Sequence, residues 1–99
     1  MDPLPPMSPA MAERLEKAVA ILREEGAREI YIFGSLAKGE ERPESDIDLA
    51  VSGLAPDKYF HTLVRLLTDL GVSVDLIDLD WHTRFVQFLH DHRSLRRVA

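Results

Sequence analysis

The segment from residue 45 to residue 52 alternates between polar or small side chains and branched apolar ones, and no other pattern constrains the fold as strongly. Ile47, Leu49 and Val51 fall on one face of the predicted strand, whereas Asp46 and Asp48 fall on the other. The two carboxylates then point the same way, about 7 Å apart along the strand. Like charges this close repel each other, unless a divalent cation lies between them. The segment therefore predicts a strand with one buried face and one acidic face.

A glycine–serine turn precedes this strand. The run 29–33 is rich in β-branched and aromatic residues and predicts a buried strand that ends at Gly34. In open α/β sheets, ligands bind at the carboxyl ends of strands. Backbone N–H groups and the hydroxyl of Ser35 can bind phosphate oxygens there, and Gly34 lets the backbone come close. The turn therefore predicts a phosphate site.

The run 72–80 supplies a third carboxylate. Alternate apolar residues from 72 to 76 suit the core face, which places Asp75 on the opposite face. If this strand pairs beside the strand that carries Asp46, three carboxylates converge. Asp78 has the other parity and is expected at the strand end. Asp80 precedes a helical pattern, which favours a role as the N-cap of that helix. We therefore expect one site built from the first two carboxylates and Asp75.

The rest of the pattern predicts helices alternating with strands. Strands are expected at about 28–33, 46–52 and 72–78, a short helical turn at 35–39, and helices from Ser8 to before Gly26, over 56–70 and over 81–91. In the helix over 56–70, the residues expected to face the core are Phe60, Leu63, Val64, Leu67 and Leu70. The fold class is α/β (α+β), a small mixed sheet with helices packed on one face and the carboxylate face open. Residues 1–7 are expected to form a flexible proline-rich arm, and 8–99 a single domain.

Composition limits the possible functions. A chain of 99 residues buries about 60 to 65% of its unfolded surface, which suffices for one sheet with a few helices. There is no cysteine, which excludes disulfides and thiolate chemistry. No signal-length or membrane-length apolar run occurs, so a cytoplasmic protein without membrane contact is expected. The net charge of -5 disfavours nucleic acid as a direct ligand.

With these motifs, the chain resembles the minimal nucleotidyltransferases of the DNA polymerase β-like superfamily. The resemblance covers roughly residues 10 to 80 and rests on the runs 32–35, 37–39, 45–49 and 74–79, in the family's order and spacing. It implies a nucleotidyltransferase fold in which Gly34 and Ser35 hold the triphosphate of ATP or another nucleoside triphosphate. It also implies that Asp46, Asp48 and Asp75 are the catalytic acids and bind two Mg²⁺ ions.

Two basic residues are further candidates for nucleotide binding. Lys38 could reach a triphosphate from the turn, as a basic residue often does in the family, although a solvated lysine is an equal alternative. Arg42 lies in the loop between the turn and the acids and is a candidate phosphate contact.

The resemblance also predicts an activity and a partner. An acceptor hydroxyl attacks the α-phosphorus of the nucleotide and pyrophosphate leaves. Minimal nucleotidyltransferases imply a helical partner of the HEPN class, a toxin that receives AMP on a tyrosine and is silenced by it, so that this chain is the antitoxin. The predicted docking surface consists of Trp81, Phe85 and Phe88 with the basic tail Arg93, Arg96 and Arg97. The alternatives are a non-catalytic subunit that neutralises its partner by binding, and a transferase acting on a small molecule.

Overall fold

A computed structural model describes residues 3–40, 46–81, 83–91 and 95–99. Along the chain, the helices and strands are α1 (Pro9–Glu24), β1 (Glu29–Ile32), α2 (Gly34–Ala37), β2 (Ile47–Ser52), a 3-10 turn (Pro56–Lys58), α3 (Tyr59–Leu70), β3 (Val74–Asp78), α4 (Arg84–Asp91) and β4 (Arg96–Arg97). Helix α1 begins as predicted, with Pro9 in its first turn and the Ser8 hydroxyl accepting a hydrogen bond from the Met11 amide at 3.1 Å.

The strands form one mixed sheet in the order β3-β2-β1-β4. Strand β1 is antiparallel to both β2 and β4, whereas β2 and β3 run parallel. A parallel pair needs a crossover connection, and α3 provides it. The crossover brings the starts of β2 and β3 side by side, which aligns Asp48 with Asp75.

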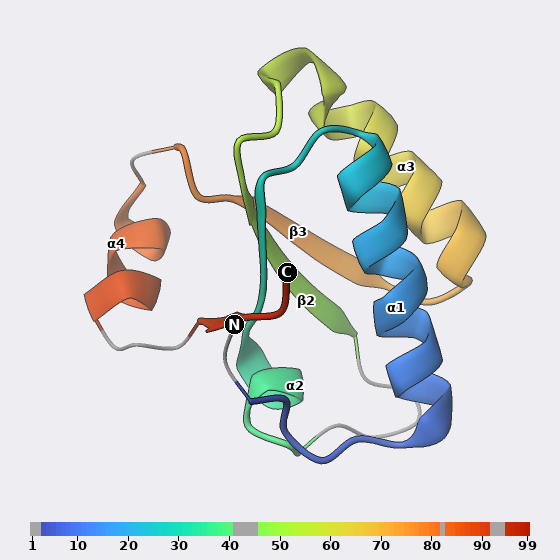
Figure 1. Cartoon of the computed structure of the whole chain (residues 1–99). Coiled ribbons are helices and arrows are strands. Elements are labelled where there is room, and N and C mark those ends of the chain that lie inside the picture. Colours follow the sequence, from blue (N-terminus) through green and yellow to red (C-terminus); the bar gives the residue numbers. More distant parts are fainter. Residues whose placement is uncertain (1–2, 41–45, 82, 92–94) are drawn as a thin grey trace.

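Helices α1 and α3 lie side by side on one face of the sheet, and α4 lies on the other side (Figure 1). The larger core fills the space between the sheet and helices α1 and α3. Its fully buried members include Met11, Leu22, Ile30, Leu49 and Leu66. The predicted class, a mixed sheet with helices, is confirmed.

The position of α4 corrects the expectation that all helices cover one face. Leu89 of α4 packs with Phe33 and Ala50 on the second face, where Tyr31, Ile77, Leu79 and Leu95 surround them. These strand residues are apolar and therefore need a cover, although they share their face with the carboxylates. Helix α4 thus closes one part of the acidic face and leaves the part around the acids uncovered.

The inward side of α3 was predicted correctly for Leu70 and Leu63, which is partly buried against the main core, and incorrectly for the other three residues. Its buried residues are Thr62, Leu66 and Leu70, whereas Phe60 is 76% exposed, Val64 60% and Leu67 41%. The helix carries apolar residues on two sides, so its periodicity alone did not decide which side faces the sheet. The outer side of α3 therefore presents an apolar stripe to solvent.

The start of the last helix also differs from the prediction. Helix α4 begins at Arg84 rather than at residue 81, and its cap is Thr83, whose hydroxyl accepts a hydrogen bond from the Val86 amide at 3.1 Å. Asp80 is not the N-cap. Its carboxylate accepts hydrogen bonds from the Ser52 hydroxyl at 3.0 Å and the Gly53 amide at 2.8 Å, which ties the ends of β2 and β3 together.

Both ends of the chain pack on the sheet region. Met7 is partly buried against the main core, and Pro5 and Pro6 lie beside Gly39. The guanidinium of Arg96 donates hydrogen bonds to the carbonyl oxygens of Ala37, at 2.9 Å, and Pro3, at 3.1 Å. The mobility of the arm and the single-domain boundary stay predictions. No helix in the described segments is long and apolar enough to cross a membrane.

Candidate active site

The parallel register of β2 and β3 places two of the predicted acids next to each other. Asp48 and Asp75 are direct partners in this register, and the burial pattern puts both side chains on the face opposite the main core. Asp46 lies exposed, immediately before the first residue of β2. The strand parity predicted from the sequence is thus correct, and the three acids lie at the amino ends of two adjacent strands.

Gly34 lies against one of these acids, Asp48. The Phe33 amide donates a hydrogen bond to the Asp48 carbonyl oxygen at 3.1 Å, which fixes the end of β1 beside the start of β2. Gly34 follows with φ +66°, and a Cβ atom at this position would lie 2.3 Å from Oδ2 of Asp48. Only glycine fits here, because any side chain would both strain the backbone and displace the carboxylate.

The acids perturb one another. The pKa of Asp48 is raised from 3.8 to about 6, first by burial, then by a hydrogen bond with Asp75, and then by the negative charges of Asp75 and Asp46. The pKa of the nearby Tyr59 phenol is also raised, by burial and by the charges of Asp78 and Asp75. The site therefore concentrates negative charge that a bound cation would relieve.

The donor chemistry fits a hard cation. Carboxylate oxygens are the ligands that Mg²⁺ takes together with substrate phosphates. Across the described ranges, no group of three His, Cys, Asp or Glu side chains is already gathered as a metal site. The assignment of Asp46, Asp48 and Asp75 as metal ligands stays a prediction.

The turn after Gly34 forms the short helix α2. The amide of Lys38 donates to the Gly34 carbonyl oxygen at 3.2 Å and the amide of Glu40 to that of Ser35 at 2.9 Å. Ser35 is partly buried, and Lys38 is exposed at the end of the helix. Arg42, like Arg93 of the predicted docking surface, lies outside the described residues. The nucleotide-binding roles of these residues stay predictions.

Sequence reasoning missed two supporting interactions. Arg96, predicted for the docking surface, donates a hydrogen bond to the carbonyl oxygen of Ala37 and so holds the end of α2. Phe85 of α4 packs edge-on against Phe33, with 6.0 Å between ring centroids, directly before Gly34. An arginine and an aromatic residue near the end of a chain carry no local signal for such contacts, because the contacts depend on the sheet topology.

Comparison with known proteins fits this geometry. Residues 16–92 match the family described as Polymerase beta, Nucleotidyltransferase. This chain belongs to that family. It is therefore a nucleotidyltransferase, as the motifs around Gly34 and Asp48 predicted.

Individual relatives agree with the assignment. A protein of Methanocaldococcus jannaschii, provisionally named a protein adenylyltransferase, is 40% identical over 67 residues, which are 64% of this chain and 68% of that protein. A crystal structure of a toxin–antitoxin with AMP-PNP superposes with a TM-score of 0.67 and 28% identity, over 83% of this chain and 69% of the other. A structure provisionally described as a minimal nucleotidyltransferase gives a TM-score of 0.66 and 27% identity, over 89% of this chain and 91% of the other.

Proposed function

We propose that this nucleotidyltransferase moves AMP from ATP to a tyrosine hydroxyl of a helical HEPN-class partner, and that the modification silences the partner. The observation that carries the proposal is the register that places Asp48 beside Asp75, with Gly34 against Asp48. The provisional adenylyltransferase name of the M. jannaschii relative and the toxin–antitoxin with AMP-PNP support the choice of AMP and of a protein acceptor.

Asp46, Asp48 and Asp75 would hold two Mg²⁺ ions together with the phosphates. When bound, the ions supply charge neutralisation for the departing pyrophosphate and lower the pKa of the acceptor hydroxyl. The fit rests on the all-oxygen donor set and on the raised pKa of Asp48, about 6, which burial, the hydrogen bond with Asp75 and the neighbouring negative charges produce in that order.

The chain's own residues position the substrates. The backbone at Gly34 and the hydroxyl of Ser35 would bind the triphosphate, with Lys38 and Arg42 as further phosphate contacts. The acceptor oxygen forms a bond to the α-phosphorus while the bond from that phosphorus to pyrophosphate breaks. Asp75 would accept the proton that the hydroxyl releases.

Co-expression with a HEPN-class partner tests the proposal. Intact mass measurement of the partner should show an addition of the size of AMP, and Asp48→Ala should abolish it while the two proteins still co-purify. A stable complex without added mass would leave a binding subunit as the function. Label that passes from γ-labelled rather than α-labelled ATP would refute nucleotidyl transfer.

A further inference from the structure

A cavity of about 590 Å³ lies between the start of α3, the edge strand β3 and the start of α4. Its walls are mainly aromatic and aliphatic, with Tyr59, Phe60, Trp81 and Phe85 among them. The described lining residues include one carboxylate, Asp78, and no lysine or arginine. A cavity of this size and composition is typical of a site that binds an apolar or aromatic group.

The aromatic walls are held in place but open to solvent. The ring of Tyr59 stacks on Trp81, with 6.4 Å between centroids, and its hydroxyl donates a hydrogen bond to the carbonyl oxygen of Leu76 in β3. Phe60 is 76% exposed, Trp81 56% and Phe85 45%. Large, solvent-exposed rings that line one cavity favour the binding of another aromatic ring, because packing against them removes apolar surface from water.

The cavity lies at one end of the row of site residues. Across the sheet, Gly34 follows β1, Asp48 lies in β2 and Asp75 in β3, which is the edge strand. Leu76 and Ile77, the next residues after Asp75, line the cavity. The row therefore runs from the phosphate turn, through the acids, to the cavity.

The geometry of phosphoryl transfer decides which substrate belongs there. The attacking oxygen and the departing pyrophosphate lie on opposite sides of the α-phosphorus, roughly in line. If pyrophosphate leaves on the side of Gly34, the attacking hydroxyl approaches from the side of Asp75. The ribose is attached to the phosphorus to the side of this line, so the nucleoside does not occupy the position from which the hydroxyl attacks.

We propose that this cavity is the acceptor subsite and receives the phenol ring of a tyrosine on the partner protein. The inference rests on the proposed function and names its acceptor contacts. The ring would pack among Phe60, Trp81 and Phe85, and its oxygen would point toward Asp75. The phenolic oxygen bonds to the α-phosphorus, pyrophosphate leaves, and the proton passes to the Asp75 carboxylate. The absence of lysine and arginine among the described lining residues suits a neutral ring and disfavours a phosphate.

Trp81 gives a direct binding measurement, because it is the chain's single tryptophan. N-acetyl-3-nitrotyrosine amide, whose ring quenches tryptophan emission, should quench Trp81 with saturation, and N-acetyl-tyrosine amide should reverse the effect. Phe60→Ala should weaken this binding roughly tenfold, as expected for the loss of one aromatic contact. Phe88→Ala is the matched control, since Phe88 is 51% exposed on α4 and does not line the cavity.

Three results would overturn the inference. The first is quenching that does not saturate, which means that no ring binds. The second is displacement of the nitrotyrosine probe by adenosine, which assigns the cavity to the base. The third is AMP addition to the partner that survives in Trp81→Ala, which would refute the acceptor subsite and leave the proposed function intact.

Discussion

At the scale of single residues, Asp48 links the chemistry of the site to the stability of the fold. Its pKa is raised from 3.8 to about 6, so the folded protein holds this proton more tightly than the unfolded chain does. The stabilising contribution is complete below about pH 4 and is lost as the pH rises through about 6. At neutral pH, without Mg²⁺, the ionised carboxylate therefore destabilises the fold.

Asp48→Asn should raise the free energy of unfolding at pH 7.5 in the absence of Mg²⁺. The full shift corresponds to about 3 kcal/mol, and screening of this partly exposed group reduces the expected gain to about 1 kcal/mol. The gain should vanish below about pH 4, where the wild-type carboxyl is protonated in both states. Urea unfolding at the two pH values measures this, with Glu16→Gln on the exposed side of α1 as the control. A less stable variant at pH 7.5 would contradict the prediction.

Gly34 and Gly71 provide a matched pair for testing the turn. Both have φ +66°, but a Cβ atom at Gly34 would lie 2.3 Å from Asp48, whereas nothing lies within 4 Å of one at Gly71. Alanine at either position should cost about 1 kcal/mol of stability, because the left-handed conformation is strained. Only Gly34→Ala should also reduce AMP transfer, by at least about tenfold, since it displaces the Asp48 carboxylate. Equal activity in the two variants would show that contact with the acid is unimportant.

The residues of the site were easier to predict than the interactions that hold their strands together. Strand parity alone placed Asp48 and Asp75 on one face, because alternation in a strand is a local property. Asp80 was assigned wrongly as an N-cap for the opposite reason. Its partners, Ser52 and Gly53, are distant in sequence and become neighbours only through the pairing of β2 with β3.

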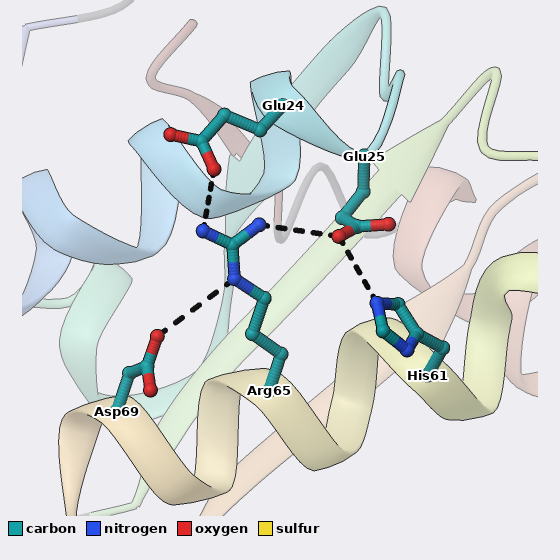
Figure 2. Close-up of polar contacts among 5 residues, drawn as sticks. All are labelled: Glu24, Glu25, His61, Arg65 and Asp69. Atoms are coloured by element: carbon teal, nitrogen blue, oxygen red, sulfur yellow. Dashed lines mark hydrogen bonds and ion pairs between the residues drawn. The ribbon is translucent and has the colours of Figure 1, made fainter.

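At the scale of helices and strands, a group of polar and charged side chains joins the end of α1 to α3 (Figure 2). Arg65 of α3 pairs with Glu24, with Glu25 at 3.1 Å and with Asp69 at 3.8 Å, and His61 contacts Glu25 at 3.3 Å. Networks of this kind stabilise more than isolated surface pairs. The cluster holds the crossover helix, and with it the parallel register of β2 and β3.

Arg65→Met should lower the urea midpoint of the protein, because it leaves Glu24, Glu25 and Asp69 close together without their shared cation. The difference from wild type should shrink by roughly half in about 1 M NaCl, where the Debye length is about 3 Å. AMP transfer at low temperature should be unchanged, since the cluster does not touch the site. Lys17→Met, an exposed residue of α1, is the control. A difference that does not depend on salt would point to lost packing rather than lost charge.

Helix α3 shows where periodicity fails. The exposed residues Phe60, Val64 and Leu67 repeat at helical spacing as well as the buried ones do. Thr62, which is polar, is completely buried, so hydrophobicity misplaced part of the inward face. Only the positions of α1 and the sheet decide between the two sides, and these are not local properties.

At the scale of the whole molecule, strand order was the information that the sequence pattern lacked. Parity gives each acid a face, but convergence also requires β2 and β3 to be neighbours, parallel and in register. The family resemblance supplied that order. It did not supply β4, which has only the residues Arg96 and Arg97 and carries no strand pattern of its own.

The ionised Asp48 carboxylate destabilises the free protein but is expected to bind metal and nucleotide, and this leads to a final prediction for the whole protein. A ligand that binds only the folded state stabilises it by about 1.4 kcal/mol at ten times its dissociation constant, which raises the melting temperature of a chain this size by roughly 5–10 °C. Mg²⁺ with AMP-PNP should have this effect on the wild type and little effect on Asp48→Asn. Thermal unfolding should therefore reverse the order of the two proteins, because the variant melts higher without ligand and lower with it. An equal rise in both would mean that Asp48 takes no part in holding the metal and nucleotide.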